Sequence, residues 1–354
     1  MNHDVFMKHA ITLAQKGLGS VSPNPLVGCV IVKDGLPAGK AEKIVAEGYH
    51  QIYGEAHAEV NAIHNLPKDI DPKDCTLYVS LEPCCHDGKT PPCADLIISK
   101  GFKKVVICNV DPNPLIAGKG IKKLKQAGIE IIQGICEKEG RYLNRRFFTF
   151  HEKKRPYIIL KWAQTADGFI SKWPIPKNRS ENKISGEEAQ KLVHQMRANE
   201  DAILVGKNTV LNDDPYLTTR LAEGKNPMRI IITGSEIPFT YNIFNEDARI
   251  VLFNRFKTEV KDHVHYIKLK AGDVVPQILE SLYKMGVSSV LVEGGLFTLS
   301  SFIVAGIWDE QHVFVNAKLN FMTGVKAPKK LLATDFQLVG SDSYYIIANT
   351  SSSK

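Results

Sequence analysis

Two short motifs constrain this chain more than any other feature. They are a histidine and a glutamate in His57-Ala58-Glu59, and cysteines that follow prolines in Pro83-Cys84 and Pro92-Cys93. One imidazole and two thiolates are typical zinc ligands, and three protein ligands leave the fourth coordination position open for water, as in catalytic sites. Glu59 can carry a proton without binding the metal. The order of these residues therefore predicts a zinc centre that activates water.

The cysteines can also be interpreted without a catalytic metal site. Free cysteine is among the most buried residue types, so all seven cysteines of the chain could be ordinary packing residues. A structural zinc would need a fourth ligand, which Cys85 or His86 offers. Clustered, unpaired cysteines beside a histidine fit a reducing compartment better than disulfides, so we expect a cytoplasmic protein. We interpret the cysteines outside the motif as packing residues, namely Cys29, Cys75, Cys85, Cys108 and Cys136.

Length and charge bound the class of protein. A chain of 354 residues is too long for one ordinary core, so we expect two domains. No apolar run reaches the roughly 18–20 residues that span a bilayer, and the N-terminal segment carries Asp4 and Lys8, unlike a secretory leader. The net charge of +7 is spread along the chain, which suits a phosphorylated small substrate or a dinucleotide and does not by itself indicate nucleic acid.

Hydrophobic periodicity predicts alternating strands and helices in both halves. In the first half we expect helices over 4–17, 57–64 and 120–127, and strands over 27–32, 43–48, 76–81, 105–109 and 129–133. The pattern changes around 141–156, where we interpret Lys153-Lys154-Arg155-Pro156 as the domain joint. A second series follows, with strands over 157–163, 202–205, 229–232, 250–253, 288–292 and 311–315, and helices over 186–199, near 275–285 and up to about 305. This alternation indicates two α/β domains, 1–150 and 151–354, with helices on both faces of a sheet.

The first motif is typical of zinc deaminases of nucleobases. Zinc lowers the pKa of bound water toward ~7, and Glu59 would take the water proton and return it to the leaving amine. Many such enzymes place two residues between the cysteines, whereas eight separate Cys84 from Cys93 here. We expect this stiff insertion to carry His86 and Lys89 over the pocket.

The run from Leu81 to Cys93, with Asn24-Pro25-x-Val27-Gly28 and His57-Ala58-Glu59, resembles the bifunctional deaminase–reductase family of riboflavin biosynthesis. The resemblance covers nearly the whole chain. It implies a cytidine-deaminase-like α/β/α sandwich with Glu59 as the proton carrier and with zinc on His57, Cys84 and Cys93. The family substrate is a 2,5-diaminopyrimidinone that bears a phosphoribosylamino group, so a cation facing phosphate is physically sensible. The implied substrate contacts are Asn24, His50, His86 and Lys89.

The second half lacks a Gly-x-Gly-x-x-Gly after a strand, which argues against a Rossmann site. Instead, Leu291–Gly295 places paired glycines between a strand and a helix, where backbone amides can approach a pyrophosphate; a plain turn is the other interpretation. The segments around Lys161 and Arg197 and from Asp201 to Arg220 resemble the family's reductase half. This implies a dihydrofolate-reductase-like α/β domain that uses NADPH. The implied substrate contacts are Lys161, Arg197, Leu217, Arg220 and Glu293, and the implied NADPH contacts are Ala163, Thr209, Asp213, Gly294 and Gly295.

One stretch departs from the family. Its Ser-x-Trp-Ile-[Ser/Thr] run is replaced by Glu181-Asn182-Lys183-Ile184-Ser185, and Trp173 in the longer preceding loop is a candidate substitute for the missing aromatic ring. Besides a bifunctional zinc hydrolase and NADPH oxidoreductase, two alternatives stay open. One is a deaminase with an inactive, scaffolding second domain. The other is a nucleic-acid deaminase that stacks bases on Phe147-Phe148 beside Arg145-Arg146. We expect a homo-oligomer that acts on a phosphorylated pyrimidine, with no nucleic-acid or membrane partner.

Overall fold

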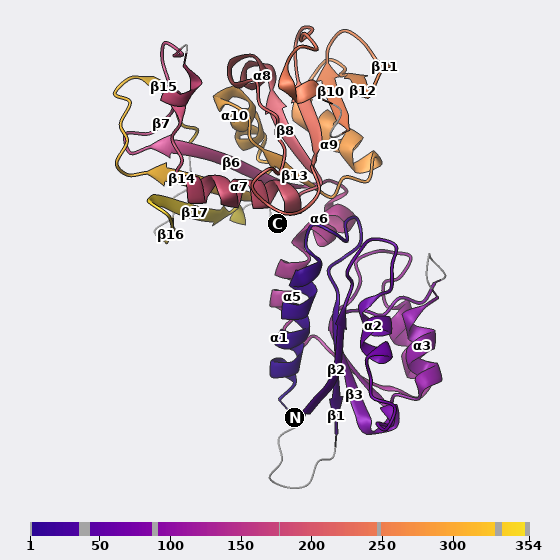
Figure 1. Ribbon diagram of the computed structural model, residues 1–354. Helices are drawn as coiled ribbons and strands as arrows, with labels where there is room; N and C mark the ends of the chain where they lie inside the picture. The colour runs from indigo at the N-terminus through magenta and orange to yellow at the C-terminus, as the bar shows by residue number, and fades with distance from the viewer. Residues whose placement is uncertain are drawn as a thin grey trace. The chain divides into compact units, whose positions relative to one another are not determined.

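The computed structural model describes residues 2–34, 43–86, 91–176, 178–245, 249–329 and 335–350. Lys89, a predicted substrate contact, lies outside these residues. The chain divides into two compact units, Met1–Lys153 and Lys154–Lys354 (Figure 1). In the part of the chain that is described, no helix is both long and apolar enough to cross a membrane.

The N-terminal unit is built on a five-stranded sheet in the order β2-β1-β3-β4-β5. Its strands are β1 (Gly28–Lys33), β2 (Lys43–Tyr49), β3 (Cys75–Leu81), β4 (Lys104–Asn109) and β5 (Glu130–Gln133), and its helices are α1 (His3–Ala14), α2 (Ala58–His64), α3 (Cys93–Lys100), α4 (Lys119–Gln126), α5 (Glu137–Leu143) and α6 (Arg145–Lys153). All seven residues of the central strand β3 are buried. A strand buried on both faces requires helices on each side of the sheet.

The two faces of this sheet have separate cores. Met7 of α1 and Leu143 of α5 belong to one cluster, whereas Ala62 of α2, Ile97 of α3 and Leu124 of α4 belong to the other. Figure 1 shows α1 and α5 on one side of the strands and α2 and α3 on the other. The predicted α/β/α sandwich is therefore confirmed.

Strand directions bring distant segments to one edge of this sheet. Strands β3 and β4 are parallel, so the residues after Leu81 and after Asn109 leave the sheet at the same edge. Strand β1 is antiparallel to β3, so the segment that enters β1 starts at that edge too. Gly48 on β2 lets α2 approach, because a Cβ there would lie 2.4 Å from the backbone nitrogen of Ala62. The first turn of α2 is thereby held over the sheet.

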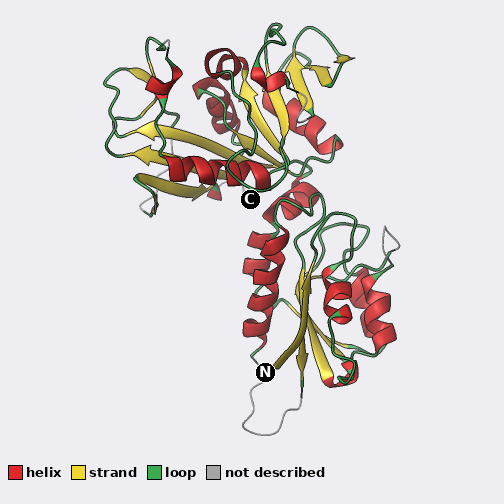
Figure 2. Cartoon of the chain, viewed as in Figure 1, coloured by secondary structure: helices red, strands yellow, loops and turns green. Residues whose placement is uncertain are grey.

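The C-terminal unit contains a ten-stranded sheet in the order β11-β12-β10-β9-β8-β13-β6-β14-β17-β16, and β15 pairs with β7 separately. Its strands are β6 (Tyr157–Thr165), β7 (Phe169–Lys172), β8 (Ala202–Gly206), β9 (Met228–Ile232), β10 (Ile250–Asn254), β11 (Glu259–Lys261), β12 (Val264–Lys268), β13 (Ser289–Val292), β14 (Glu310–Asn316), β15 (Gly324–Lys326), β16 (Gln337–Val339) and β17 (Asp342–Ala348). Its helices are α7 (Glu187–Asn199), α8 (Lys207–Asp213), α9 (Val274–Lys284) and α10 (Leu296–Ala305) (Figure 2).

Helices cover both faces of this second sheet. Ile278 of α9 and Phe302 of α10 share the largest core cluster with alternate residues of β6. On the other face, Met196 of α7 packs with Tyr157 and Ile159, and α8 contributes to a further cluster. The central strands β8, β13 and β6 run parallel, so polar residues that follow β13 lie beside β6.

Candidate active sites

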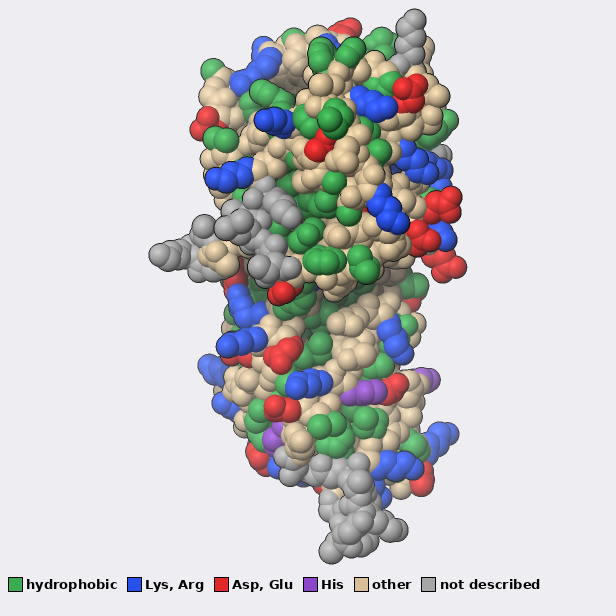
Figure 3. Space-filling view, turned by 90° about the vertical axis from the view of Figure 1, so that its left-hand side faces the viewer, with side chains coloured by type: hydrophobic (Ala, Val, Ile, Leu, Met, Phe, Trp, Pro, Cys, Tyr) green, Lys and Arg blue, Asp and Glu red, His purple; other side chains and the backbone are tan. Residues whose placement is uncertain are grey.

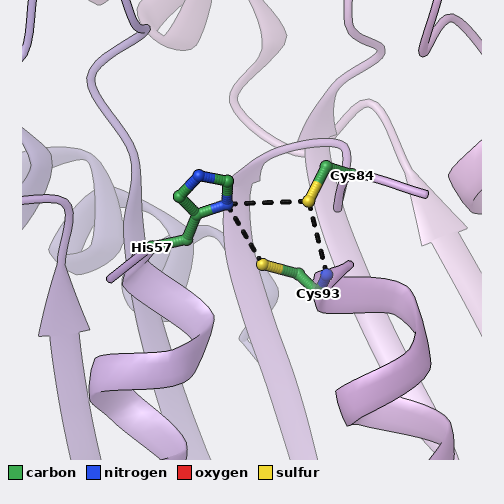
Figure 4. Close-up of side chains that lie close together, drawn as sticks. All are labelled: His57, Cys84 and Cys93. Carbon is green, nitrogen blue, oxygen red and sulfur yellow. Dashed lines mark hydrogen bonds between the residues drawn. The ribbon is translucent and has the colours of Figure 1, made fainter. Parts of the chain in front are cut away.

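The predicted zinc ligands converge at the edge of the N-terminal sheet. His57 precedes α2, Cys84 follows β3 and Cys93 begins α3. The Nδ1 atom of His57 lies 3.3 Å from the Sγ of Cys93 and 3.6 Å from the Sγ of Cys84 (Figure 4). Within the described ranges, these three residues are the group of histidines, cysteines and acids whose ligand atoms all lie within 4.8 Å of one another. An imidazole nitrogen and two sulfurs are the donor set that zinc prefers.

The surroundings of the two cysteines shift the pKa values of their thiols in opposite directions. A hydrogen bond from Cys93 lowers the pKa of Cys84 to about 4, and His57 and the Cys93 backbone N–H, 3.3 Å from the Cys84 Sγ, favour the thiolate further. The pKa of Cys93 is raised by that same contact and by burial. Metal ligation requires both thiols to lose their protons, so metal binding here releases protons.

Glu59 lies in the first turn of α2, 3 % exposed. Burial, followed by the negative charge of Cys84, raises its pKa to about 7. A cation bound by the neighbouring ligands would act in the opposite sense, because it favours the ionised carboxylate. A carboxylate buried beside the predicted zinc ligands can accept a proton and return it.

A cavity of about 250 Å³ opens beside these residues. His50 lines it, accepts a hydrogen bond at Nε2 from Asn24 Nδ2 over 3.2 Å, and donates from Nδ1 to the carbonyl of Ala56 over 3.1 Å. Burial lowers the pKa of His50, so this ring is neutral. His86 lines the same cavity and is exposed. The structure thus brings Asn24, His50 and His86 to the predicted zinc ligands.

Two further polar residues of this cavity were missed by sequence reasoning. Asp111 and Asn113 follow β4 and line the wall beside Cys84. The Asn113 backbone N–H donates to Asp111 Oδ1 over 2.7 Å, and burial raises the pKa of Asp111 to about 7. The available signal was the Asp111-Pro112-Asn113-Pro114 turn directly after a buried strand. Polar residues at the carboxyl ends of neighbouring parallel strands meet at one edge.

Glu82 has a supporting role in the same wall. Its carboxylate accepts backbone hydrogen bonds from Asp111, Gly118 and Ile121, at 3.2, 2.9 and 3.1 Å. These bonds tie the segment that carries Cys84 to the loop that carries Asp111. Cys85, the proposed fourth ligand of a structural zinc, instead packs against the core on the α2–α4 face.

A second polar cluster lies in the C-terminal unit, where Glu293 follows β13. Its carboxylate accepts hydrogen bonds from Arg197 Nε and Nη2 on α7, at 3.0 and 2.9 Å, and lies 3.5 Å from the Lys161 Nζ on β6. All three side chains are at most 13 % exposed. Burial would raise the pKa of Glu293, but Arg197 and Lys161 outweigh it and lower the pKa to about 2.

Arg220 and Leu217 join this cluster through one short segment. Arg197 Nη1 donates to the Thr218 carbonyl over 3.2 Å, and Arg220 Nη1 donates to the Thr218 hydroxyl over 2.9 Å. Leu217 adopts a φ of 53°, which is strained for a branched side chain, and its side chain is buried in the core under α8. Only the backbone of Leu217 is therefore available for a substrate.

Only some of the predicted cofactor residues lie close to one another. Gly295 is the N-cap of α10, and a Cβ there would lie 3.8 Å from Thr209 Oγ1. Gly294 packs closely on Thr298, since a Cβ there would lie 2.5 Å from the Thr298 Cβ. Ala163 packs beside the α7 core cluster, and Asp213 is exposed at the end of α8. The paired glycines and the N-terminus of α10 form a surface suited to an anionic group.

The atypical loop is anchored by Asn182. Its Oδ1 accepts from the Lys172 backbone N–H over 2.9 Å, and its Nδ2 donates to Ser171 Oγ over 3.2 Å. Trp173, the candidate substitute for the missing aromatic ring, is 63 % exposed. Its ring is largely in solvent in this structure.

The proposed base-stacking pair is buried. Phe147 and Phe148 are 8 and 4 % exposed and pack with Leu81, and Arg141 lies over the ring of Phe148. Phe148 therefore offers no face on which a base can stack, and the accessible part of Phe147 faces the cavity beside the predicted zinc ligands. On the face drawn in Figure 3, lysine and arginine side chains are interspersed with acidic ones.

Comparisons with known proteins match both units. The N-terminal residues 1–109 match the family model "Cytidine and deoxycytidylate deaminase zinc-binding region", and residues 156–320 match "RibD C-terminal domain". The riboflavin biosynthesis protein RibD of Aquifex aeolicus is 42 % identical over 327 residues, which cover 89 % of this chain and 86 % of that protein. The RibD protein of Bacillus amyloliquefaciens is 39 % identical, with 94 and 89 % covered.

Two solved structures resemble this chain along almost its whole length. The diaminohydroxyphosphoribosylaminopyrimidine deaminase/5-amino-6-(5-phosphoribosylamino)uracil reductase of Thermotoga maritima has a TM-score of 0.84, with 39 % identity and 98 % of each chain covered. Acinetobacter baumannii RibD also has a TM-score of 0.84, with 32 % identity and 98 % of each chain covered.

Proposed function

This chain belongs to the RibD family of riboflavin biosynthesis, and from that premise we propose how its residues divide the family's two reactions. The protein is a bifunctional enzyme, a zinc-dependent deaminase joined to an NADPH-dependent reductase. It acts on a small-molecule pyrimidine. The deaminase with an inactive second domain and the nucleic-acid deaminase are not favoured. The observation that carries the assignment of residues is the convergence of His57, Cys84 and Cys93 around one point beside buried Glu59.

His57, Cys84 and Cys93 would hold the zinc ion. The fit rests on the donor set, because one imidazole nitrogen and two sulfurs within 4.8 Å match zinc's preferred ligands. When bound, zinc makes water available as a nucleophile near neutral pH. Glu59 takes a proton from that water and delivers it to the exocyclic amine, which leaves as ammonia while the ring carbon gains a carbonyl oxygen. Asn24, His50, His86, Asp111 and Asn113 would orient the pyrimidine, and Lys89 would meet the substrate from the insertion.

The C-terminal unit would bind the deaminated ribotide at Lys161, Arg197, Arg220 and Glu293 and at the backbone of Leu217. The reaction adds a hydride and a proton to the ribosyl group, which becomes ribityl, and bound NADPH supplies the hydride. The three cations and one carboxylate leave a net charge of +2, which suits a phosphate monoester of about −1.5 to −2. Ala163, Thr209, Asp213, Gly294 and Gly295 would contact the cofactor.

We further propose a cytoplasmic homo-oligomer that binds no nucleic acid. The free cysteines support a reducing compartment. Phe297 and Val304 on α10, 86 and 87 % exposed, support burial against another subunit, and the burial of Phe148 argues against base stacking on that ring. Light scattering on the purified protein checks the oligomeric state.

One experiment tests the division of labour. The purified protein is incubated with 2,5-diamino-6-(5-phosphoribosylamino)pyrimidin-4-one, with and without NADPH, and ammonia release and NADPH absorbance are followed separately. We expect ammonia in both samples and NADPH oxidation only after ammonia appears. Ammonia release that requires NADPH would contradict the proposal.

A further inference from the structure

His194 is a buried histidine at the second site to which no function has been given. It lies on α7, one helical turn before Arg197, and is 5 % exposed. Residues three positions apart on a helix share a face, so both side chains reach the segment from Thr218 to Leu221. The Leu221 backbone N–H donates to His194 Nδ1 over 3.5 Å, and the Thr218 backbone lies close enough to the ring to act on its pKa. One imidazole thus lies against both ends of a four-residue segment.

Arg220 lies within that segment. Thr218 is bound by both arginines, since its carbonyl accepts from Arg197 and its hydroxyl accepts from Arg220. The arginines come from different parts of the fold, Arg197 from α7 and Arg220 from the segment that follows α8. Their common orientation depends on the position of Thr218, which Arg197 holds against α7 directly and which His194 supports through Leu221, three residues further on.

The charge state of His194 suits this role. Burial, then Arg197 and then Arg220, lower its pKa to about 4, while Glu293 and the Thr218 hydrogen bond act in the opposite sense. The ring is therefore neutral near pH 7. A neutral imidazole accepts one hydrogen bond and donates another, which a protonated ring cannot do because both nitrogens then donate. It also adds no fourth cation to a cluster whose three cations and one carboxylate already carry a net charge of +2.

We propose that His194 is a positioning residue of the reductase, which holds the Thr218–Leu221 segment against α7 so that Arg197 and Arg220 face one substrate phosphate. This inference rests on the proposed function, in which these arginines bind that phosphate. It predicts that His194 affects recognition of the phosphate and not of the pyrimidine or NADPH.

The test compares two ligands on the full-length enzyme. Titration calorimetry in the presence of NADP⁺ gives the Kd of the deaminated ribotide and of the same compound without phosphate. For His194→Leu, which can neither accept nor donate, we expect the Kd of the ribotide to rise about tenfold, as for loss of one or two hydrogen bonds. The Kd of the unphosphorylated compound should stay within about twofold of wild type.

His194→Asn is the conservative variant, because its amide oxygen and N–H supply both functions near the position of the ring edge. It should restore most of the ribotide affinity, which a purely structural role for the ring volume would not produce, because asparagine is much smaller than histidine. If His194→Leu does not fold, as judged by its melting temperature, His194→Asn is compared with His194→Ala instead.

Three outcomes separate the claims. An unchanged ribotide Kd in His194→Leu, with a weakened one in Arg220→Met, would overturn the role of His194 and leave the phosphate site intact. Equal weakening of both ligands would also overturn it. A wild-type enzyme with no preference for the phosphorylated ligand would overturn the phosphate assignment of the proposed function, and the inference with it.

Discussion

Arg197 and Glu293 form a two-fold hydrogen-bonded ion pair, although 96 positions separate them in the chain. The pair joins α7 to the end of β13 and lies next to Lys161, so one buried carboxylate is shared by two buried cations. Removing one partner from such a group lowers the free energy of unfolding strongly, because the remaining side chains are then buried charges without compensation.

Acid should weaken the C-terminal unit through Glu293. Its folded-state pKa is about 2, below the reference value of 4.5, so the unfolded chain binds more protons between these values. The stability from Glu293 is thus complete above about pH 4.5 and is lost as the pH falls toward 2. Glu293→Gln should cost about 3 kcal/mol at neutral pH, and this cost should shrink with acidification. Urea unfolding of both proteins over a pH series measures it, and a cost independent of pH would contradict the ion-pair account.

Glu59→Gln should retain zinc and lose deamination. The amide keeps the shape of the side chain but cannot move the proton, so ammonia release should fall about 10²–10⁴-fold. Reduction of the deaminated ribotide should be unchanged. The matched control is Glu47→Gln, an exposed position on β2 bound to His9, which should leave both activities intact. Loss of both activities in Glu59→Gln would mean that the two sites are wrongly assigned.

Substitutions of Cys93 and Cys85 should differ in their effect on zinc content. Cys93→Ser removes a sulfur of the three-ligand cluster and should lose most bound zinc, because a serine hydroxyl is a poor zinc ligand. Cys85→Ser, beside Cys84 but packed against the core, should retain it. Elemental analysis after gel filtration provides the readout. Zinc loss in Cys85→Ser with retention in Cys93→Ser would reverse the ligand assignment.

Gly295→Ala tests the cofactor surface. In the free protein the new Cβ would meet only Thr209 Oγ1, at 3.8 Å, so the melting temperature should not change. In the complex the methyl group would stand between the α10 N-terminus and the cofactor phosphates, and the Kd for NADPH should rise about tenfold or more. Fluorescence titration with NADPH measures this, and unaltered affinity would place the phosphates elsewhere.

The zinc site was the part most accessible from sequence. His57, Glu59, Cys84 and Cys93 occur in a pattern typical of nucleobase zinc deaminases, and the β3 run before Cys84 is strongly apolar. Asp111 was not accessible in this way. It joins the site because β4 lies parallel beside β3, and strand neighbours are set by tertiary packing.

Hydrophobic periodicity failed to predict some helices and strands, for identifiable reasons. No helix was predicted over α6, because the basic residues Arg145, Arg146 and Lys153 obscure its apolar period, yet Phe147 and Phe148 bury one side of it. Strand β17 was missed near the C-terminus, where it pairs with β14 along seven residues. The contact of Arg197 with Glu293 has no local signature, and only the family resemblance suggested that the two residues meet.

The central claim is that one chain carries two separable active sites, of which only the N-terminal one needs zinc. Dialysis of the purified enzyme against a chelator tests it most directly, with ammonia release from the diaminopyrimidine ribotide and NADPH oxidation with the deaminated ribotide assayed side by side. We predict that chelation abolishes ammonia release and leaves NADPH oxidation intact. Added zinc should restore ammonia release. Ammonia release that persists in zinc-free enzyme would contradict the account.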